Sequence, residues 1–389
     1  MMNNPNIDKR VLQWLFDNGS PVIRYRVASM FGISNRSVDG ESLEHELLND
    51  KAVNKWLNNL KSYEYMSEQR MLGKGLGMGG SSSFLHGSKN MNLEVVLPKL
   101  GQLGLHAGMS VLDKKTISWR SYLESELQNV YNKEYLDDSE FHHKVYSHHD
   151  HRLIIASSLA LAGYITDEAV RKVVYLRINA IFEAVKTGSY DIYEKPGDLN
   201  IRPKKWENHI LKREYYPDGN IRLPFIHDIC AFASIYKYTD HVTKNQIDTI
   251  INWILSPEYK LLRNYAYIRY PSGRGKHVGD NMNFTDDFDS DMESFAIKSL
   301  VLRCWQMAHF PSARNHSWFR KSINHLNSFI TDRGTYIFPS IYLNEISDGG
   351  KWIYGLHMGL GENRHSANWR ELESTFWMMA IWLAMSDIE

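Results

Sequence analysis

The sequence predicts an all-α fold, a single (α/α) toroid domain of about six helical hairpins over residues 1–389. Apolar residues recur at helical spacing through most of the chain, whereas the alternation typical of strands is rare. Helices that are apolar on nearly every side alternate with amphipathic ones, as expected when outer helices enclose inner ones. An internal repeat is also indicated, because turns 59, 75 and 70 residues apart lie at Gly104, Gly163, Tyr238 and Ala308.

The N-terminal part, residues 1–65, is expected to consist of short helices. Pro21 favours a helix start, because the first turn of a helix does not use the N–H that proline lacks. The helical segments are predicted at 7–16, 21–31, 42–48 and 52–63.

Inner and outer helices alternate after this part. Thr166, which precedes Asp167 and Glu168, is the kind of residue that caps a helix start. Pro98 lies inside an inner helix and is expected to kink it. Inner helices are predicted at 93–105, 153–161, 226–236, 295–308 and 372–382, and outer helices at 114–127, 167–186, 243–255 and 317–330.

Residues 66–90 and 257–290 are expected to form flexible loops over the mouth of a central cavity. The first contains a run with five glycines in eight residues, which removes backbone stiffness. It lacks the Gly-Lys-Ser/Thr ending of a phosphate-binding loop, so a mobile flap is the favoured interpretation. The second offers cations that could bind a phosphate or carboxylate, namely Arg269, Arg274 and Lys276.

Composition excludes several classes of protein. The 45 Lys+Arg residues balance 45 Asp+Glu residues, whereas nucleic-acid binding through a global positive field needs uncompensated cations. Cys230 and Cys304 are too few for a disulfide framework, and no segment approaches the ~18 apolar residues of a membrane span. We therefore expect a soluble, cytoplasmic protein with no nucleic-acid partner and no membrane span; the sequence leaves its oligomeric state open.

Ionisable residues gather just before the predicted inner helices. If these helices run parallel around an axis, their N-termini open at one end, and the residues there converge on one mouth. The acidic run 286–293 offers neighbouring carboxylates that raise one another's pKa, and the histidine-rich run 147–151 offers groups that exchange protons near neutral pH. The candidate catalytic residues are Asp289, Asp291, Glu293, His148, His149, His151, Glu371 and Glu373.

The chain is rich in rings, with 11 Trp, 22 Tyr, 15 Phe and 17 His residues, and several aromatic residues fall on predicted inner helices. An aromatic cavity suits apolar chains, stabilises cations over the ring faces and stacks on sugars. The alternative for each aromatic residue is ordinary core packing. For a small-molecule substrate, the candidate binding residues are His86, Lys89, His227, Trp305, Arg364, His365, Arg370 and Trp377.

A family resemblance rests on short motifs spread over the chain. They are Ser-Pro-Val-Ile-Arg-Tyr-Arg at 20–26, Ala-Val-Asn-Lys-Trp-Leu at 52–57, His-Gly-Ser-Lys-Asn at 86–90 and Leu-Gly-Gln-Leu-Gly-Leu at 100–105, with 291–305 and 370–377. In them the chain resembles the terpenoid cyclase and prenyltransferase repeat superfamily, including squalene-cyclase-like bacterial members of unassigned activity. The resemblance implies the toroid, and cyclase or transferase activity of the lyase, transferase or isomerase classes.

The chain also departs from this superfamily's motifs. It lacks the Asp-x-Asp-Asp motif of squalene-hopene-type cyclases, and Ser290 replaces the last aspartate of Asp-Asp-x-x-Asp. Protein prenyltransferases hold zinc with an Asp-x-Cys pair and a distant histidine; Asp228 and Cys230 match the pair, but acidic residues stand near the later position. The implied metal site, for Mg²⁺ or Zn²⁺, consists of Asp228, Cys230 and Glu293, although the sequence fixes no cofactor.

We therefore expect an enzyme that acts on a small hydrophobic or isoprenoid-like substrate in an aromatic central cavity, by acid–base or carbocation chemistry. One alternative is an (α/α)-barrel glycan hydrolase or lyase that uses paired carboxylates. The other is a non-catalytic binding scaffold, because a fold does not fix a function. In that case the acidic run is a solvated capping loop and the histidines lie on the surface.

Overall fold

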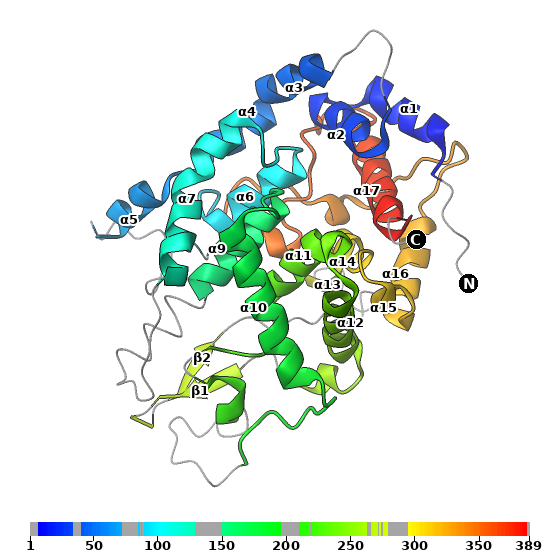
Figure 1. The fold of residues 1–389 in the computed structure, drawn as a ribbon. Helices are drawn as coiled ribbons and strands as arrows, with labels where there is room; N and C mark the ends of the chain where they lie inside the picture. The colour runs from blue at the N-terminus through cyan, green and yellow to red at the C-terminus, as the bar shows by residue number, and fades with distance from the viewer. Residues whose placement is uncertain are drawn as a thin grey trace.

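The computed structural model is mostly helical, which confirms the all-α prediction (Figure 1). It describes residues 7–33, 40–71, 85, 87, 89–128, 150–195, 210–217, 220–262, 266–270, 272–273, 275–278 and 295–386. The α-helices are α1 (Lys9–Asn18), α2 (Pro21–Phe31), α3 (Gly40–Asn49), α4 (Lys51–Asn59), α5 (Tyr63–Met71), α6 (Leu93–Gln102), α7 (Ser110–Gln128), α9 (Asp150–Leu161), α10 (Glu168–Val185), α11 (Ile226–Ile235), α12 (His241–Leu255), α13 (Phe295–Lys298), α14 (Leu300–Met307), α15 (Pro311–Arg314), α16 (Ser317–Asn327) and α17 (Trp369–Ser386). Short 3₁₀ helices are η3 (Arg213–Tyr215), η5 (Tyr236–Tyr238), η6 (Tyr259–Leu261), η7 (Ser340–Leu343) and η8 (Trp352–Tyr354).

Two expectations about local structure need correction. The cap of α10 is Asp167 rather than Thr166, because the Asp167 carboxylate accepts hydrogen bonds from the amides of Ala169 (3.1 Å) and Val170 (3.3 Å). The range 257–290, expected to be a loop, contains an antiparallel hairpin. Its first strand includes Tyr267 and Ile268, residue types that favour strands. Its strands are β1 (Ala266–Arg269) and β2 (Gly275–Val278).

An inner layer is formed by α2, α6, α9, α11, α14 and α17. In this order α6 contacts α9, α9 contacts α11, α11 contacts α14 and α14 contacts α17, and α17 contacts α2. The remaining link, between α2 and α6, is a hydrogen bond that Arg26 donates to the carbonyl of Gln102 at the end of α6 (2.7 Å). It closes the series of inner helices into a circuit. Helices α6, α9, α11, α14 and α17 are rich in buried apolar residues, as the sequence predicted for these segments, whereas α2 was expected only as a short N-terminal helix.

Three pairs of neighbouring inner helices run in the same direction, because their C-terminal ends meet. After α6 and α9, Ala107 donates its N–H to the carbonyl of Ala162 (2.9 Å). After α11 and α14, the rings of Tyr236 and Phe310 meet edge to face, with centroids 5.4 Å apart. Arg314, which follows α14, donates to the Ala384 carbonyl at the end of α17 (2.9 Å).

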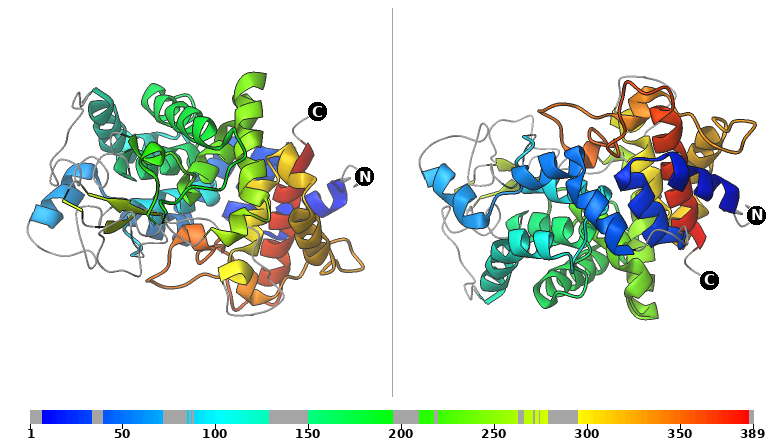
Figure 2. Two further views of the ribbon diagram at one scale, coloured as in Figure 1. Left: turned by 90° about the horizontal axis from the view of Figure 1, so that it is seen from below. Right: turned by 90° about the horizontal axis from the view of Figure 1, so that it is seen from above.

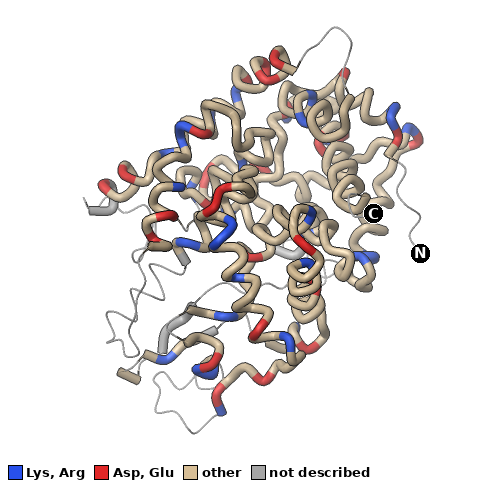
Figure 3. Tube along the Cα trace, in the orientation of Figure 1, with Lys and Arg blue, Asp and Glu red and all other residues tan. Residues whose placement is uncertain are grey.

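An outer layer covers this circuit. Helix α10 packs against α9 and α11, and it contacts α7 and α12 on either side, while α16 packs against α14. The two ends of the chain lie side by side, since α1 and α2 contact α17; both views in Figure 2 place the red C-terminal helix against the dark blue N-terminal helices. Basic and acidic residues are interspersed along the helices (Figure 3). None of the described helices combines the length and apolarity needed to cross a bilayer.

The chain between η7 and α17 passes through the interior of the circuit. Trp352 of η8 donates its indole N–H to the side-chain oxygen of Gln102 on α6 (2.7 Å). Gly355, only three residues later, packs against the backbone of Lys298 and Ser299 between α13 and α14. Because α6 and α14 are opposite members of the circuit, this segment fills part of the space between them.

Lys99 of α6 holds this interior segment. Its side chain is 1% exposed, and Nζ donates to Oε2 of Glu345 (2.7 Å) and to the carbonyls of His357 (2.9 Å) and Gly359 (2.5 Å). The amide of Gln102 donates to the same two carbonyls, at 2.9 Å each. Burial lowers the pKa of Lys99, and Glu345 opposes that shift. Burial alone would raise the pKa of Glu345, but Lys99 and His357 outweigh it and lower that pKa to about 2.

The inner helix predicted at 295–308 is split into α13 and α14 around Ser299. At this point Gly355 has φ +71°, and a Cβ built on it would lie 2.7 Å from Cα of Ser299 and closer still to the Lys298 carbonyl. Only glycine allows so close an approach of two backbones. Gly349 shares the left-handed conformation, with φ +91°, but has open space around it.

The pair Gly355→Ala and Gly349→Ala therefore separates backbone strain from packing. We expect G349A to lower the free energy of unfolding by about 1 kcal/mol, the cost of a side chain in the left-handed region. G355A should cost about 1–3 kcal/mol more, because the added methyl overpacks the interior. Urea unfolding of both variants measures the difference, and equal losses would show that Gly355 is not closely packed.

Lys99→Met should remove the ammonium group and leave Glu345 and two buried carbonyls without this donor. We expect a loss of about 3 kcal/mol or more in the free energy of unfolding, as for other ion pairs broken at a buried partner. The control is Lys51→Met, which alters an exposed lysine on α4. A K99M variant as stable as K51M in urea unfolding would contradict this role.

Candidate functional site

Glu94 and His227 form a buried pair at the N-terminal ends of α6 and α11. Nε2 of His227 lies 2.9 Å from Oε2 of Glu94, and their side chains are only 9% and 1% exposed. The other carboxylate oxygen of Glu94 accepts the N–H of Gly87 (2.6 Å). A carboxylate at one ring nitrogen fixes the tautomer of a histidine and stabilises its protonated form, which suits it to proton transfer.

Asp228, the next residue on α11, is held by Arg177 of α10. The guanidinium donates from Nε to Oδ1 (2.8 Å) and from NH2 to Oδ2 (2.7 Å), and Oδ2 also accepts the N–H of Phe225 (2.8 Å). Both side chains are buried. The pair therefore fixes the first turn of α11, and with it the backbone that carries His227.

The predicted metal ligands Asp228 and Cys230 have separate partners. Burial raises the pKa of the Cys230 thiol to about 12, so the thiol stays protonated, and its Sγ accepts a hydrogen bond from Gln306 (3.0 Å). Both oxygens of Asp228 are bound to Arg177. These two residues therefore do not fit a metal site as they stand. Among the described residues, no group of three or more His, Cys, Asp and Glu side chains could hold a metal ion; Glu293 lies outside them.

The predicted aromatic residues lie on the inner layer. Trp377 of α17 is buried and donates its indole N–H to the Met358 carbonyl of the interior segment (3.0 Å). Trp305 of α14 is partly buried, with its ring centroid 6.3 Å from that of Trp377. His151 is buried in the first turn of α9, at the same end of the inner layer as Glu94 and His227.

The two predicted carboxylates of α17 contact different parts of the chain. Glu371 accepts hydrogen bonds from Arg333 (2.9 Å) and from the hydroxyl of Thr335 (2.5 Å), so it anchors the turn before η7. Glu373 is fully buried; it accepts the Leu360 N–H (2.7 Å), and its other oxygen lies 2.9 Å from the guanidinium of Arg364. Neither carboxylate is close to a described histidine in a way that would make an acid–base pair.

Other predicted binding residues lie at or near the surface. Arg364 stacks on Trp369, 4.0 Å from the ring centroid, and donates to the Leu343 carbonyl (2.9 Å). Exposed side chains belong to Lys89, His365 and Arg370. The remaining candidates lie outside the described residues: His86, His148, His149, Asp289, Asp291 and Glu293.

Sequence analysis missed Glu94, which forms the pair with His227. A signal was present, because Glu94 and Lys99 are charged residues inside a segment that is otherwise apolar on every side, and charges are almost never buried without partners. Glu345 and His357 could not be found in this way, because they lie in a segment without helical periodicity.

Comparisons with family models, with curated proteins and with solved structures each found no match. No role is therefore transferred to this site from a relative, and the resemblance to the terpenoid cyclase and prenyltransferase superfamily stays a prediction.

Glu373 makes the stability of the fold depend on pH. Burial raises its pKa to about 7, and Arg364 and the Leu360 N–H only partly oppose this shift. The protonated Glu373 therefore contributes fully to stability below the pKa of a glutamate in the unfolded chain, about 4.3. This contribution is lost as the pH rises to 7. Relative to Glu373→Gln, the wild type should lose up to about 1.4 kcal/mol per pH unit across this window. Urea unfolding of both proteins at pH 5 and pH 7 measures this, and a constant difference would contradict it.

Proposed function

We propose that this chain is an enzyme on an (α/α) toroid, with α2, α6, α9, α11, α14 and α17 as the inner ring, and that it performs acid–base chemistry at the N-terminal end of that ring. The single observation that carries the proposal is the buried hydrogen bond between His227 and Glu94, 2.9 Å long. A histidine that pairs with a carboxylate in this manner can serve as a general acid–base group.

In this proposal His227 is the proton carrier and Glu94 is its positioning residue. With Glu94 as acceptor of an Nε2–H, His227 would exchange protons with substrate through Nδ1. The negative charge of Glu94 then stabilises the imidazolium that forms. The Asp228–Arg177 pair keeps the first turn of α11 in place, so that the ring nitrogen stays within reach of the reacting group.

We propose a small hydrophobic or isoprenoid-like substrate, with cyclase or transferase chemistry. The support is the resemblance in the motifs around 20–26 and 86–90, together with the aromatic side chains of Trp305 and Trp377 on neighbouring inner helices. Aromatic faces bind apolar chains and stabilise positive charge that develops on them.

One observation favours a second candidate, a non-catalytic scaffold. The interior segment around η8 occupies space between α6 and α14 that a central substrate cavity would need. In such a protein the His227–Glu94 pair would be a structural contact between two helices. The two candidates differ in the effect that they predict for the loss of His227 on substrate turnover.

To test the proposal, wild type, His227→Asn and Glu94→Gln are incubated with short isoprenoid alcohols and their diphosphates, and with neutral disaccharides. Products are followed by mass spectrometry. We expect turnover of an isoprenoid compound and a loss of about 10²–10⁴-fold in both variants, the usual effect of removing a general acid–base group. His241→Asn, an exposed histidine at the start of α12, is the matched control and should keep full activity.

The proposal is wrong if H227N turns over substrate at the rate of H241N while both proteins are folded. Product formation from disaccharides alone would favour the glycan hydrolase or lyase. No turnover of any compound by the wild type would favour the scaffold.

A further inference from the structure

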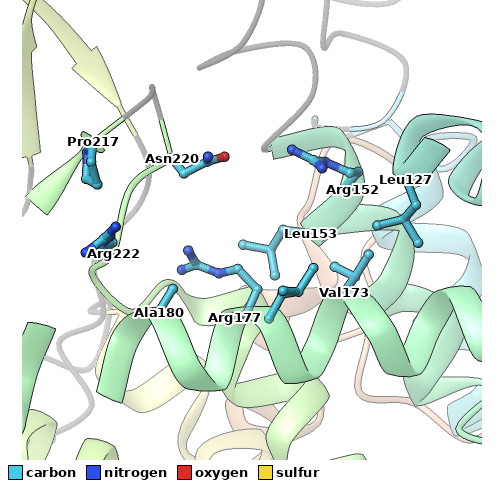
Figure 4. Close-up of a pocket in the computed structure, with 10 residues that line it drawn as sticks. Leu127, Arg152, Leu153, Val173, Arg177, Ala180, Pro217, Asn220 and Arg222 are labelled. Atoms are coloured by element: carbon cyan, nitrogen blue, oxygen red, sulfur yellow. The ribbon is translucent and has the colours of Figure 1, made fainter. Parts of the chain in front are cut away.

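A cavity of about 240 Å³ lies outside the inner layer, between α7, α9, α10 and the turn that precedes α11 (Figure 4). Figure 4 shows an uneven distribution of its side chains. Leu127, Leu153 and Val173 gather at one end, where Arg152 also lies, whereas Arg177, Arg222 and Asn220 lie toward the other. The cavity therefore has a mainly apolar half and a cationic half.

The cationic half is built on a rigid support. Arg177 is fixed by both oxygens of Asp228, and it also donates to the carbonyls of Leu223 (2.9 Å) and Ile221. These two carbonyls flank Arg222, so the turn that carries Arg222 is tied to α10. The N–H of Arg222 in turn donates to the Tyr215 carbonyl (2.8 Å). Arg222 is thus held at the cavity by its backbone, while its side chain is half-buried.

The charged residues among the described lining residues are all arginines, although Arg177 is paired with Asp228. Arginines reach the cavity from three separate elements, with Arg152 from α9 in addition to Arg177 and Arg222, and none of the described residues that line it is an aspartate or glutamate. In Figure 4 the side chains of Arg152 and Asn220 extend toward each other across the cavity. Guanidinium groups bind carboxylates and phosphates with paired hydrogen bonds.

The apolar half of the cavity indicates the chemistry of the ligand's body. Leu176, at the rim, is 53% exposed although it is a large apolar side chain. A ligand with a hydrocarbon body would cover this side chain and the apolar wall below it. The volume is smaller than the about 300–1,000 Å³ of pockets for drug-sized molecules, which favours a short chain.

We infer that this cavity binds a small amphipathic anion, with a carboxylate or phosphate head at Arg222, beside the Arg177–Asp228 pair, and a short hydrocarbon body against Leu127, Leu153 and Val173. The site is separate from the His227–Glu94 pair, and the inference does not depend on the proposed function. The head would neutralise the half-buried Arg222, whereas the buried Arg177 is already balanced by Asp228.

The test uses isothermal titration calorimetry of the full chain with octanoate and with hexyl phosphate, which distinguish a carboxylate from a phosphate head. Octanol and acetate are the controls for the body alone and the head alone. We expect saturable binding of at least one of the two amphipathic anions, and weaker or no binding of octanol and acetate.

Two variants locate the site. Arg222→Gln removes the positive charge but keeps the backbone hydrogen bonds of this turn. It should weaken binding about tenfold or more, the effect of losing a charge-assisted hydrogen bond. Ala180→Leu keeps every charge and fills the cavity beside Arg222, so it should abolish binding. Arg171→Gln, an exposed arginine on the same helix that does not line the cavity, is the matched control and should bind as the wild type does. Circular dichroism melting checks that each variant is folded.

Failure of both anions to bind the wild type would overturn the inference. So would equal affinities of R222Q and R171Q, unchanged binding by A180L, or octanol binding as tightly as octanoate.

Discussion

The buried ammonium group of Lys99 is the contact on which the interior of this protein depends. A chain that crosses the middle of a helical protein outside any helix or sheet has carbonyl groups that must find partners away from water. Lys99 and Gln102 supply donors for the carbonyls of His357 and Gly359. Trp377 does the same for Met358. Side chains of inner helices therefore take the place of a neighbouring strand, and the segment becomes part of the core.

Periodicity predicted most of the fold because it reports burial directly. The segment 21–31 coincides with α2, and 243–255 differs from α12 by two residues at its start. The split at Ser299 was beyond prediction, because it lies where Gly355, more than fifty residues later, meets the helix. The same holds for the interior segment, whose position is set by hydrogen bonds to side chains distant in the sequence. Local pattern cannot report such contacts.

The candidate site was predicted only in outline. Titratable residues were predicted to meet at the N-terminal ends of inner helices. His227 and His151 lie in the first turns of α11 and α9, whereas Asp228, Glu371 and Glu373 are bound to arginines of the same chain. Residue type alone does not distinguish a carboxylate that binds a substrate from one that binds an arginine of the same chain. A burial argument would have found Glu94, since an acid inside an apolar helix needs a partner such as His227.

The contact between the two ends of the chain bears on how the protein is made. Helix α2 packs on α17, with the guanidinium of Arg26 4.5 Å from the ring centroid of Phe376, and the N–H of Ser20 is bound by Glu362. During synthesis α2 leaves the ribosome more than three hundred residues before these partners exist. The circuit of inner helices therefore cannot close until α17 has been synthesised, and α2 must wait with its apolar face uncovered. Termination before α17 would leave α2 without this packing.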